Sequence, residues 1–289
     1  MNNFFLTIII AAGILFSAYG QDYVPTKQDL DQFYKTKTLV VLDDNPLNEY
    51  NFIIQDLIKK EWTLTPYDFI SLSEFETKRL DPQYSFLVTT LVGFELDKTK
   101  AKYKFLHLML GGDYFRMNQM PDIVAVPLAY ENVTEEYYIY KLATMVRLIQ
   151  SHVKLITENT DLIRTKTFKY YKDNIGDIQK KTLYIVREEL AKEVNSESLV
   201  KKVYPYKFKI VTREEVQEAI ERRDKDVVFL HKVGPEGTKL YARCYKIVIG
   251  ADEPTLYYFD YHMISDKKPD GFLAKDFEKL VKKSGLLLD

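Results

Sequence analysis

Asp43 and Asp44 are the residues whose type and position best suit a metal ion. They follow Thr38 to Leu42, an apolar run typical of a strand buried on both faces. Open α/β sheets bind ligands at the carboxyl ends of strands, and carboxylate oxygens suit magnesium or calcium. However, Asp43 and Asp44 precede Asn45 and Pro46, and all four residues are common in turns. We favour a turn and retain Asp43 and Asp44 as candidate metal ligands.

Asp260 and His262 are the candidate catalytic residues. They lie two positions apart in an extended run, so both side chains are expected on one face of a strand. A carboxylate and an imidazole there could act as general acid and base. The sequence offers no third group for such a site and contains no G-x-S-x-G motif. A triad assembled from distant residues stays open, because geometry and not sequence order defines a triad.

Neither a transition metal nor a nucleotide cofactor is expected. Zinc sites need clustered His and Cys, but Cys244 is the sole cysteine and the histidines are far apart. We interpret the histidines as residues of the core or of strand edges; they are His107, His152, His231 and His262. The chain has no P-loop and no G-x-G-x-x-G motif, and Gly111-Gly112 does not open a helix.

The charge balance argues against a nucleic-acid partner. Lys and Arg number 41 against 42 Asp and Glu, and residues 1–20 contain none of these four types. The chain is therefore nearly neutral with or without its amino terminus, and it shows no basic footprint. Its 289 residues, of which 46% are hydrophobic, suit one large or two smaller domains.

The amino terminus has the pattern of a signal peptide. Phe4 to Phe16 is an apolar run too short to cross a bilayer, and Ala18-Tyr19-Gly20 supplies small residues at alternate positions. We predict a signal peptide at residues 1–20, cleaved after Gly20, and no transmembrane segment in the mature chain. The lack of Lys and Arg before the run leaves an uncleaved anchor as the alternative. A chain without disulfides suits the bacterial periplasm.

The sequence contains two similar halves. Lys37 to Leu42 (KTLVVL) matches Lys181 to Val186 (KTLYIV), and further resemblances recur at a separation of 139 residues. These pair Pro66-Tyr67 with Pro205-Tyr206, Ser73-Glu74 with Thr212-Arg213, and Gly111-Gly112-Asp113 with Gly250-Ala251-Asp252. Each half reads as strand, helix, strand, helix, three strands, helix. This predicts an α/β fold with mixed sheets that arose by tandem duplication, with chance similarity as the alternative.

A long central helix is predicted between the halves. Apolar residues recur at helical spacing from Tyr138 to Ile163, Thr134 is the expected N-cap, and Asn159 begins a break. We favour a packing helix over a partner-binding coiled coil, because the heptads end at that break. The expected organisation is a polar lead-in at 21–36, a first domain at 37–160, a helical linker at 161–180 and a second domain at 181–289.

The order of elements in each half resembles small α/β domains of bacterial envelope proteins. Examples are the amino-terminal domain of the translocation protein TolB and the curli-secretion lipoprotein family. The resemblance is one of layout and assigns no residue roles. The lipoprotein cysteine of the second family has no counterpart here.

Together these patterns lead us to expect a non-catalytic secreted or periplasmic protein that binds another envelope component, either a protein or a glycan. The clustered aromatic residues, among 22 Tyr and 17 Phe, suit such a surface, although strand packing explains them as well. The alternative function is that of a periplasmic hydrolase with its site in the cleft between the two halves.

Overall fold

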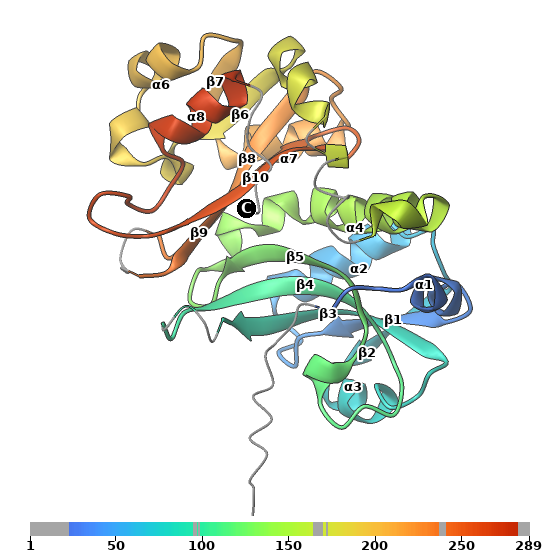
Figure 1. Cartoon of the computed structure of the whole chain (residues 1–289). Coiled ribbons are helices and arrows are strands. Elements are labelled where there is room, and N and C mark those ends of the chain that lie inside the picture. Colours follow the sequence, from blue (N-terminus) through green and yellow to red (C-terminus); the bar gives the residue numbers. More distant parts are fainter. Residues whose placement is uncertain are drawn as a thin grey trace, which may run out of the picture.

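The protein is an α/β fold built on two five-stranded mixed sheets (Figure 1). The computed structural model describes residues 23–94, 97, 99–163, 170–171, 173–236 and 241–282. The strands of the first sheet are β1 Lys37–Leu42, β2 Tyr67–Ser71, β3 Tyr84–Gly93, β4 Lys102–Leu110 and β5 Asp122–Tyr130. Those of the second are β6 Thr182–Val186, β7 Phe208–Val211, β8 Val227–Val233, β9 Arg243–Gly250 and β10 Leu256–Met263. The α-helices are α1 Lys27–Phe33, α2 Glu49–Glu61, α3 Leu72–Lys78, α4 Leu142–Glu158, α6 Glu197–Val203, α7 Arg213–Glu221 and α8 Ala274–Val281.

Both sheets have the same strand order. The first is β2-β1-β3-β4-β5, and the second, read in the same sense, is β7-β6-β8-β9-β10. In each half the first strand pairs in parallel with the second and third strands, and the later pairs are antiparallel. The parallel connections run through helices, whereas the antiparallel ones need no crossover. Consequently β5 and β10 are edge strands at corresponding ends of the two sheets.

Alternating side chains of each strand pack against different layers. In the first sheet, Val40 and Leu87 belong to the core shared with α1, α2 and α4, whereas Phe86 packs with Phe75 of α3 on the other face. In the second sheet, Phe229 belongs to the shared core on the side of α7, and Val228 packs with α6 and α8. Because successive side chains of a strand point to opposite faces of the sheet, the central strands are buried on both faces. No helix in the described ranges is long and apolar enough to cross a membrane.

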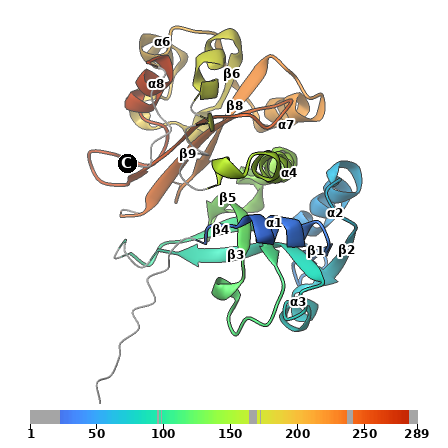
Figure 2. The same cartoon turned by 45° about the vertical axis from the view of Figure 1, so that its right-hand side comes forward.

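Helix α4 lies between the two sheets (Figure 2). Leu142, Val146, Ile149 and Val153 are fully buried and belong to one core with residues of both halves. A wide apolar stripe of this kind is expected of a helix that packs between two layers. The packing helix predicted from the sequence is therefore present, and it is enclosed by both sheets.

The predicted start of the central helix was wrong. Thr134 makes no capping bond, and two 3₁₀ turns, Glu135–Tyr137 and Ile139–Lys141, precede α4. Tyr138 interrupts the helix with φ −134° and ψ −23°, and Lys141 is fully buried against the other half. Helical periodicity cannot show such a long-range contact. The predicted break at Asn159 is confirmed, because this residue ends α4.

Local contacts set the boundaries of other elements. Ser71 caps α3 through a capping box with Glu74. In the second half α6 begins only at Glu197, because backbone bonds of Glu189 and Ala191 to Phe272 hold the preceding segment extended. Of the linker at 161–180, residues 164–169 and 172 lie outside the described residues, and Asp173–Lys180 forms a 3₁₀ helix. The expected signal segment, 1–20, also lies outside them.

The shared core predicts that the halves unfold together. We expect Phe229→Ala, a fully buried change in the second half, to lower the free energy of unfolding by about 3–5 kcal/mol. Trp62, the sole tryptophan, lies in the same core but in the first half, so its fluorescence should report this loss as an earlier denaturant midpoint. Leu47→Ala, at a side chain that is 80% exposed, is the control. An unchanged Trp62 transition in Phe229→Ala would show that the halves unfold independently.

Candidate binding groove between the sheets

A groove of about 440 Å³ runs between the two sheets, beside the edge strand β5. We call it the inter-sheet groove. Its walls are six consecutive residues of β5, Asp122 to Pro127, the β9–β10 hairpin, and α4 with the segment before α1. The side chains and segments that line it are Tyr23–Pro25, Phe94, Phe105, 122–127, Leu148, His152, Ile156, Ile163, Tyr171, Arg243, Tyr245, Ile247, Leu256, Phe259 and Tyr261. Most are apolar or aromatic, and a volume of this size is typical of ligand sites.

Strand β5 pairs with β4 on one side only, and its other side faces the groove. Beyond Pro127 the second sheet covers the strand, because His231 Nε2 of β8 donates to the Pro127 carbonyl at 2.9 Å. This bond shows that the Pro127 carbonyl points away from β4. Pro127 is also the signal by which the sequence could have identified an edge strand, since proline within a strand is confined to edges and bulges.

Arg243 closes one end of the groove. Its guanidinium forms two bonds with Asp97, at 2.5 and 2.7 Å, and lies over the ring of Phe94 at 3.8 Å and that of Tyr261 at 4.8 Å. Burial opposes the charge of Arg243, but the bond to Asp97 and the neighbouring groups raise its pKa overall. The Tyr103 hydroxyl accepts from the Arg243 backbone N–H at 2.6 Å and so joins the two sheets. This end of the groove is consequently held by fixed contacts.

Asp122 and His152, two further polar side chains of the groove, are each paired through one atom. Asp122 Oδ2 lies 2.6 Å from His107 Nδ1 on the neighbouring strand, and His152 Nδ1 lies 2.9 Å from the Tyr171 hydroxyl. Burial lowers the pKa of His152 to about 4, so this imidazole is neutral at physiological pH. With Asp122 and Arg243 each facing an oppositely charged or ionisable partner, the groove presents little free charge.

The candidate metal ligands lie elsewhere and form a turn. Asp43 Oδ1 accepts from the Asn45 backbone N–H at 2.9 Å, and the Asp43 backbone N–H donates to Asn51 Oδ1 at 2.8 Å. Asp44 is exposed beside them. Among the described residues, no group of three or more His, Cys, Asp or Glu side chains is placed to hold a metal ion. The structure thus assigns Asp43 the turn role that its sequence context also favoured.

The candidate catalytic pair lies on the outer face of the second sheet. Asp260 and His262 do share one face of β10, opposite the groove-lining Phe259 and Tyr261. Asp260 pairs with Lys279 of α8 at 2.5 Å, whereas His262 Nε2 donates to the Pro269 carbonyl at 2.9 Å. Burial lowers the pKa of His262, as does nearby Lys246. Each side chain therefore serves a separate structural contact.

Buried ion pairs fill the carboxyl ends of β6 and β8. Lys141 forms an ion pair with Glu189, which follows β6, and Lys232 on β8 reaches Asp270 at 2.7 Å and Glu236 at 2.8 Å. Burial lowers the pKa of Lys141, whereas Asp270 and Glu236 outweigh burial and raise that of Lys232. The adjoining cavity measures about 10 Å³, room for about one water molecule.

These buried ion pairs were not predicted from the sequence, although the sequence contains a pattern that indicates them. Lys232 and Lys246 are single lysines within largely apolar strands, a pattern that indicates paired burial. Lys246 indeed reaches Asp276 of α8 at 2.6 Å. The position where α/β sheets commonly hold a ligand is thus occupied here by the protein's own charges.

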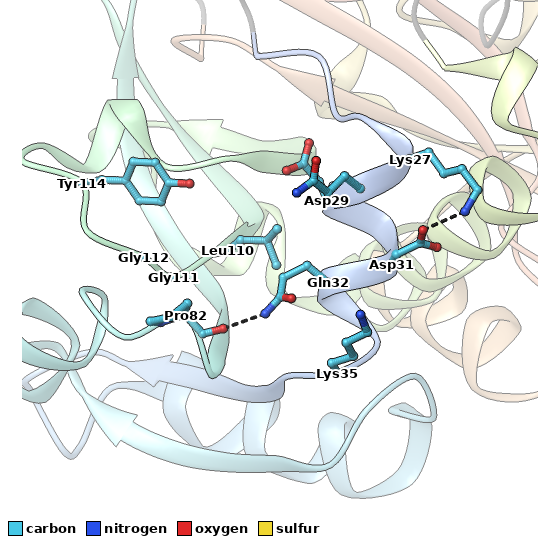
Figure 3. Close-up of a pocket in the computed structure, with 11 residues that line it drawn as sticks. Lys27, Asp29, Asp31, Gln32, Lys35, Pro82, Leu110, Gly111, Gly112 and Tyr114 are labelled. Atoms are coloured by element: carbon cyan, nitrogen blue, oxygen red, sulfur yellow. Dashed lines mark hydrogen bonds and ion pairs between the residues drawn. The ribbon is translucent and has the colours of Figure 1, made fainter.

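A second depression lies on the surface between α1 and the loop after β4 (Figure 3). Its volume is about 680 Å³, but its walls are polar and its charges are largely engaged. Lys27 pairs with Asp31 at 2.7 Å, and Asp29 caps α1 and accepts from the Tyr23 hydroxyl at 2.7 Å. Open polar surfaces of this kind bind weakly, because water competes for every contact. The inter-sheet groove is the better candidate site.

The buried His231 makes the contact between the sheets dependent on pH. Burial and, to a smaller extent, the nearby Lys141 charge lower its pKa from 6.5 to about 3, although the bond to Pro127 opposes this shift. Below pH 6.5 His231 is therefore protonated in the unfolded chain but stays neutral in the folded chain. This difference lowers the free energy of unfolding by about 1.4 kcal/mol per pH unit. His231→Gln retains an N–H donor for Pro127 without this titration. Between pH 7 and 5 we expect unfolding free energies to fall by about 2 kcal/mol more in the wild type than in the variant; equal slopes would contradict this.

Known proteins assign no role to the groove or to the ion pairs. Comparisons with protein-family models, with curated proteins and with solved structures find no match to this chain. A functional assignment therefore rests on the geometry of the inter-sheet groove.

Proposed function

We propose that this chain is a non-catalytic secreted or periplasmic protein that binds another envelope component in the inter-sheet groove. The observation that carries the proposal is the lining of this groove, which is mostly apolar and aromatic and in which Asp122 and Arg243 each face a partner within the chain. Such a surface gains free energy by excluding water and offers aromatic area for contact. A protein partner fits this lining better than a glycan, because a glycan needs polar partners for its hydroxyl groups.

The same lining weakens the hydrolase alternative. Hydrolysis by a covalent mechanism needs a nucleophile beside a base, and none of the described residues lining the groove is Ser, Thr or Cys. Cys244 is fully buried, and burial raises the pKa of its thiol. The pair of His107 and Asp122 resembles part of a catalytic set, but two groups alone do not complete one.

We also propose that the two halves arose by duplication of one strand-helix-strand-helix-three-strand-helix unit, with domains at 37–160 and 181–289 joined by the linker at 161–180. The shared strand order and the shared pattern of parallel and antiparallel pairs support this origin. The recurrence of sequence features at one separation supports it independently. On this proposal α4 is the last helix of the first unit, and α8 corresponds to it.

The periplasmic or secreted location has a direct test. We expect the protein purified from its producing cell to begin at Gln21, because the signal peptidase cuts after small residues such as Gly20. Intact-mass spectrometry of the fractionated cells measures this. A mature chain that still carries residues 1–20, or one confined to the cytoplasmic fraction, would contradict the location.

The binding role predicts site-specific crosslinking in the living cell. A photoreactive phenylalanine analogue replaces Phe259 in the groove or, as a matched control, Phe115, whose side chain is 84% exposed on another surface. We expect the analogue at position 259 to crosslink one recurrent envelope protein and the analogue at position 115 to give no such product. The reason is that a partner gains free energy by burying the apolar lining of the groove. Phe259→Ala should then lower co-purification of that partner by about tenfold, equivalent to about 1.4 kcal/mol. Equal products at both positions, or turnover of a hydrolase substrate blocked by Phe259→Ala, would contradict a purely binding role.

A further inference from the structure

We infer that the occupant of the inter-sheet groove is an uncharged, extended segment of a partner protein that adds as a further strand to the edge of β5. This inference rests on the proposed function and specifies its partner. The groove follows six consecutive residues of one strand, which means that the backbone of β5, and not only its side chains, forms the wall. An exposed sheet edge of this kind recognises extended peptides through main-chain hydrogen bonds.

Ala125 supplies the central pairing groups. Pairing between β4 and β5 keeps one register from Pro127, opposite Phe105, to Val124, opposite Leu108. Within such a run the N–H and C=O of alternate residues point to the same side. Since the Pro127 carbonyl faces the second sheet, the N–H and C=O of Ala125 face the groove. Ala125 is exposed, and its small side chain leaves space for an approaching strand.

The groove continues an interface that already exists within the chain. From Pro127 onward the edge of β5 is covered by β8, whereas Asp122 to Val126 of the same edge stay uncovered. An added strand of about five residues, some 17 Å long, would complete this cover. Its other side would lie on the inner face of the β9–β10 hairpin, where Phe259 pairs with Ile247 and Tyr261 with Tyr245.

Charge and polarity select among possible occupants. Asp122 and Arg243 are paired within the chain, so a charged residue in the occupant would lose its hydration without gaining a free counterion. An acyl chain would match the aromatic wall but would bury the N–H and C=O of Ala125 without partners. A peptide strand satisfies both requirements, since its backbone pairs with Ala125 and its neutral side chains contact Phe259 and Ile247.

The test uses the purified protein and a displayed library of random twelve-residue peptides. We expect selection to enrich uncharged sequences rich in β-branched and aromatic residues. Ala125→Pro removes the N–H that faces the groove and leaves pairing with β4 intact, because that ladder does not use this group. Calorimetry should show that Ala125→Pro weakens the enriched peptides by at least about tenfold, whereas Ala125→Val, which retains the N–H, changes affinity by less than about threefold.

A second measurement does not depend on the fold of the variant. In the wild type, a bound peptide should slow hydrogen exchange of the Ala125 amide by at least about tenfold, whereas the Val124 and Val126 amides, which face β4, should change little. Unchanged exchange at Ala125 with a peptide bound would overturn strand addition, as would equal affinity of Ala125→Pro.

Two further probes separate other occupants. Binding of palmitate or of phospholipid vesicles to the groove, with no peptide enriched, would overturn the inference in favour of a lipid. Binding of a synthetic peptide of residues 4–16 that protects Ala125 would replace the partner by the chain's own amino terminus. If Phe259→Ala weakens the peptides and Ala125→Pro does not, the groove remains the binding site and only strand addition fails. If neither variant weakens binding of the peptides, the proposed function fails as well.

Discussion

The enclosure of α4 between two sheets is the constraint on which the rest of the structure depends. Most side chains of this helix are buried, and its buried polar residues Arg147 and Gln150 bond to neighbouring layers. Arg147 donates to Glu61 at the end of α2 and to the Ile220 carbonyl of α7, and Gln150 accepts from the backbone N–H of Thr63. These bonds connect α4 to both halves. Because each is directional, they help to orient the helix relative to the two sheets.

The buried ion pairs contribute to this arrangement more than to stability. Removing two charges from water costs about as much free energy as their attraction returns, so a pair such as Lys141 and Glu189 adds little net stability. Breaking the pair would leave a buried charge alone, and any misplacement of α4 would do the same. Gly234 shows how closely the network is packed, because a Cβ atom there would meet Asp270 Oδ1 at 2.2 Å. Alternative packings that separate Lys141 from Glu189 are therefore penalised.

The sequence predicted local structure better than it predicted contacts between segments. The apolar run at β1, the helix after it and the antiparallel strands of both halves follow from period and turn chemistry, which nearby residues determine. The start of α4 could not be predicted, since Lys141 is positioned by Glu189, 48 residues away. Asp260 and His262 were correctly placed on one face of a strand, but the identity of the layer covering this face depends on the tertiary fold. The groove itself combines segments from Tyr23 to Tyr261, and only Pro127 marked its edge strand in advance.

The position of the second sheet beside β5 also has a consequence for self-association. An open, apolar sheet edge invites the edges of other copies and can nucleate aggregates. Here the β9–β10 hairpin faces the uncovered part of β5 across the groove, and Pro127 removes a donor where the cover begins. A groove of about 440 Å³ has room for a short length of a single strand, whereas another folded sheet carries side chains and layers that do not fit. We therefore expect the geometry that exposes Ala125 to a single strand to disfavour edge-to-edge association of folded copies.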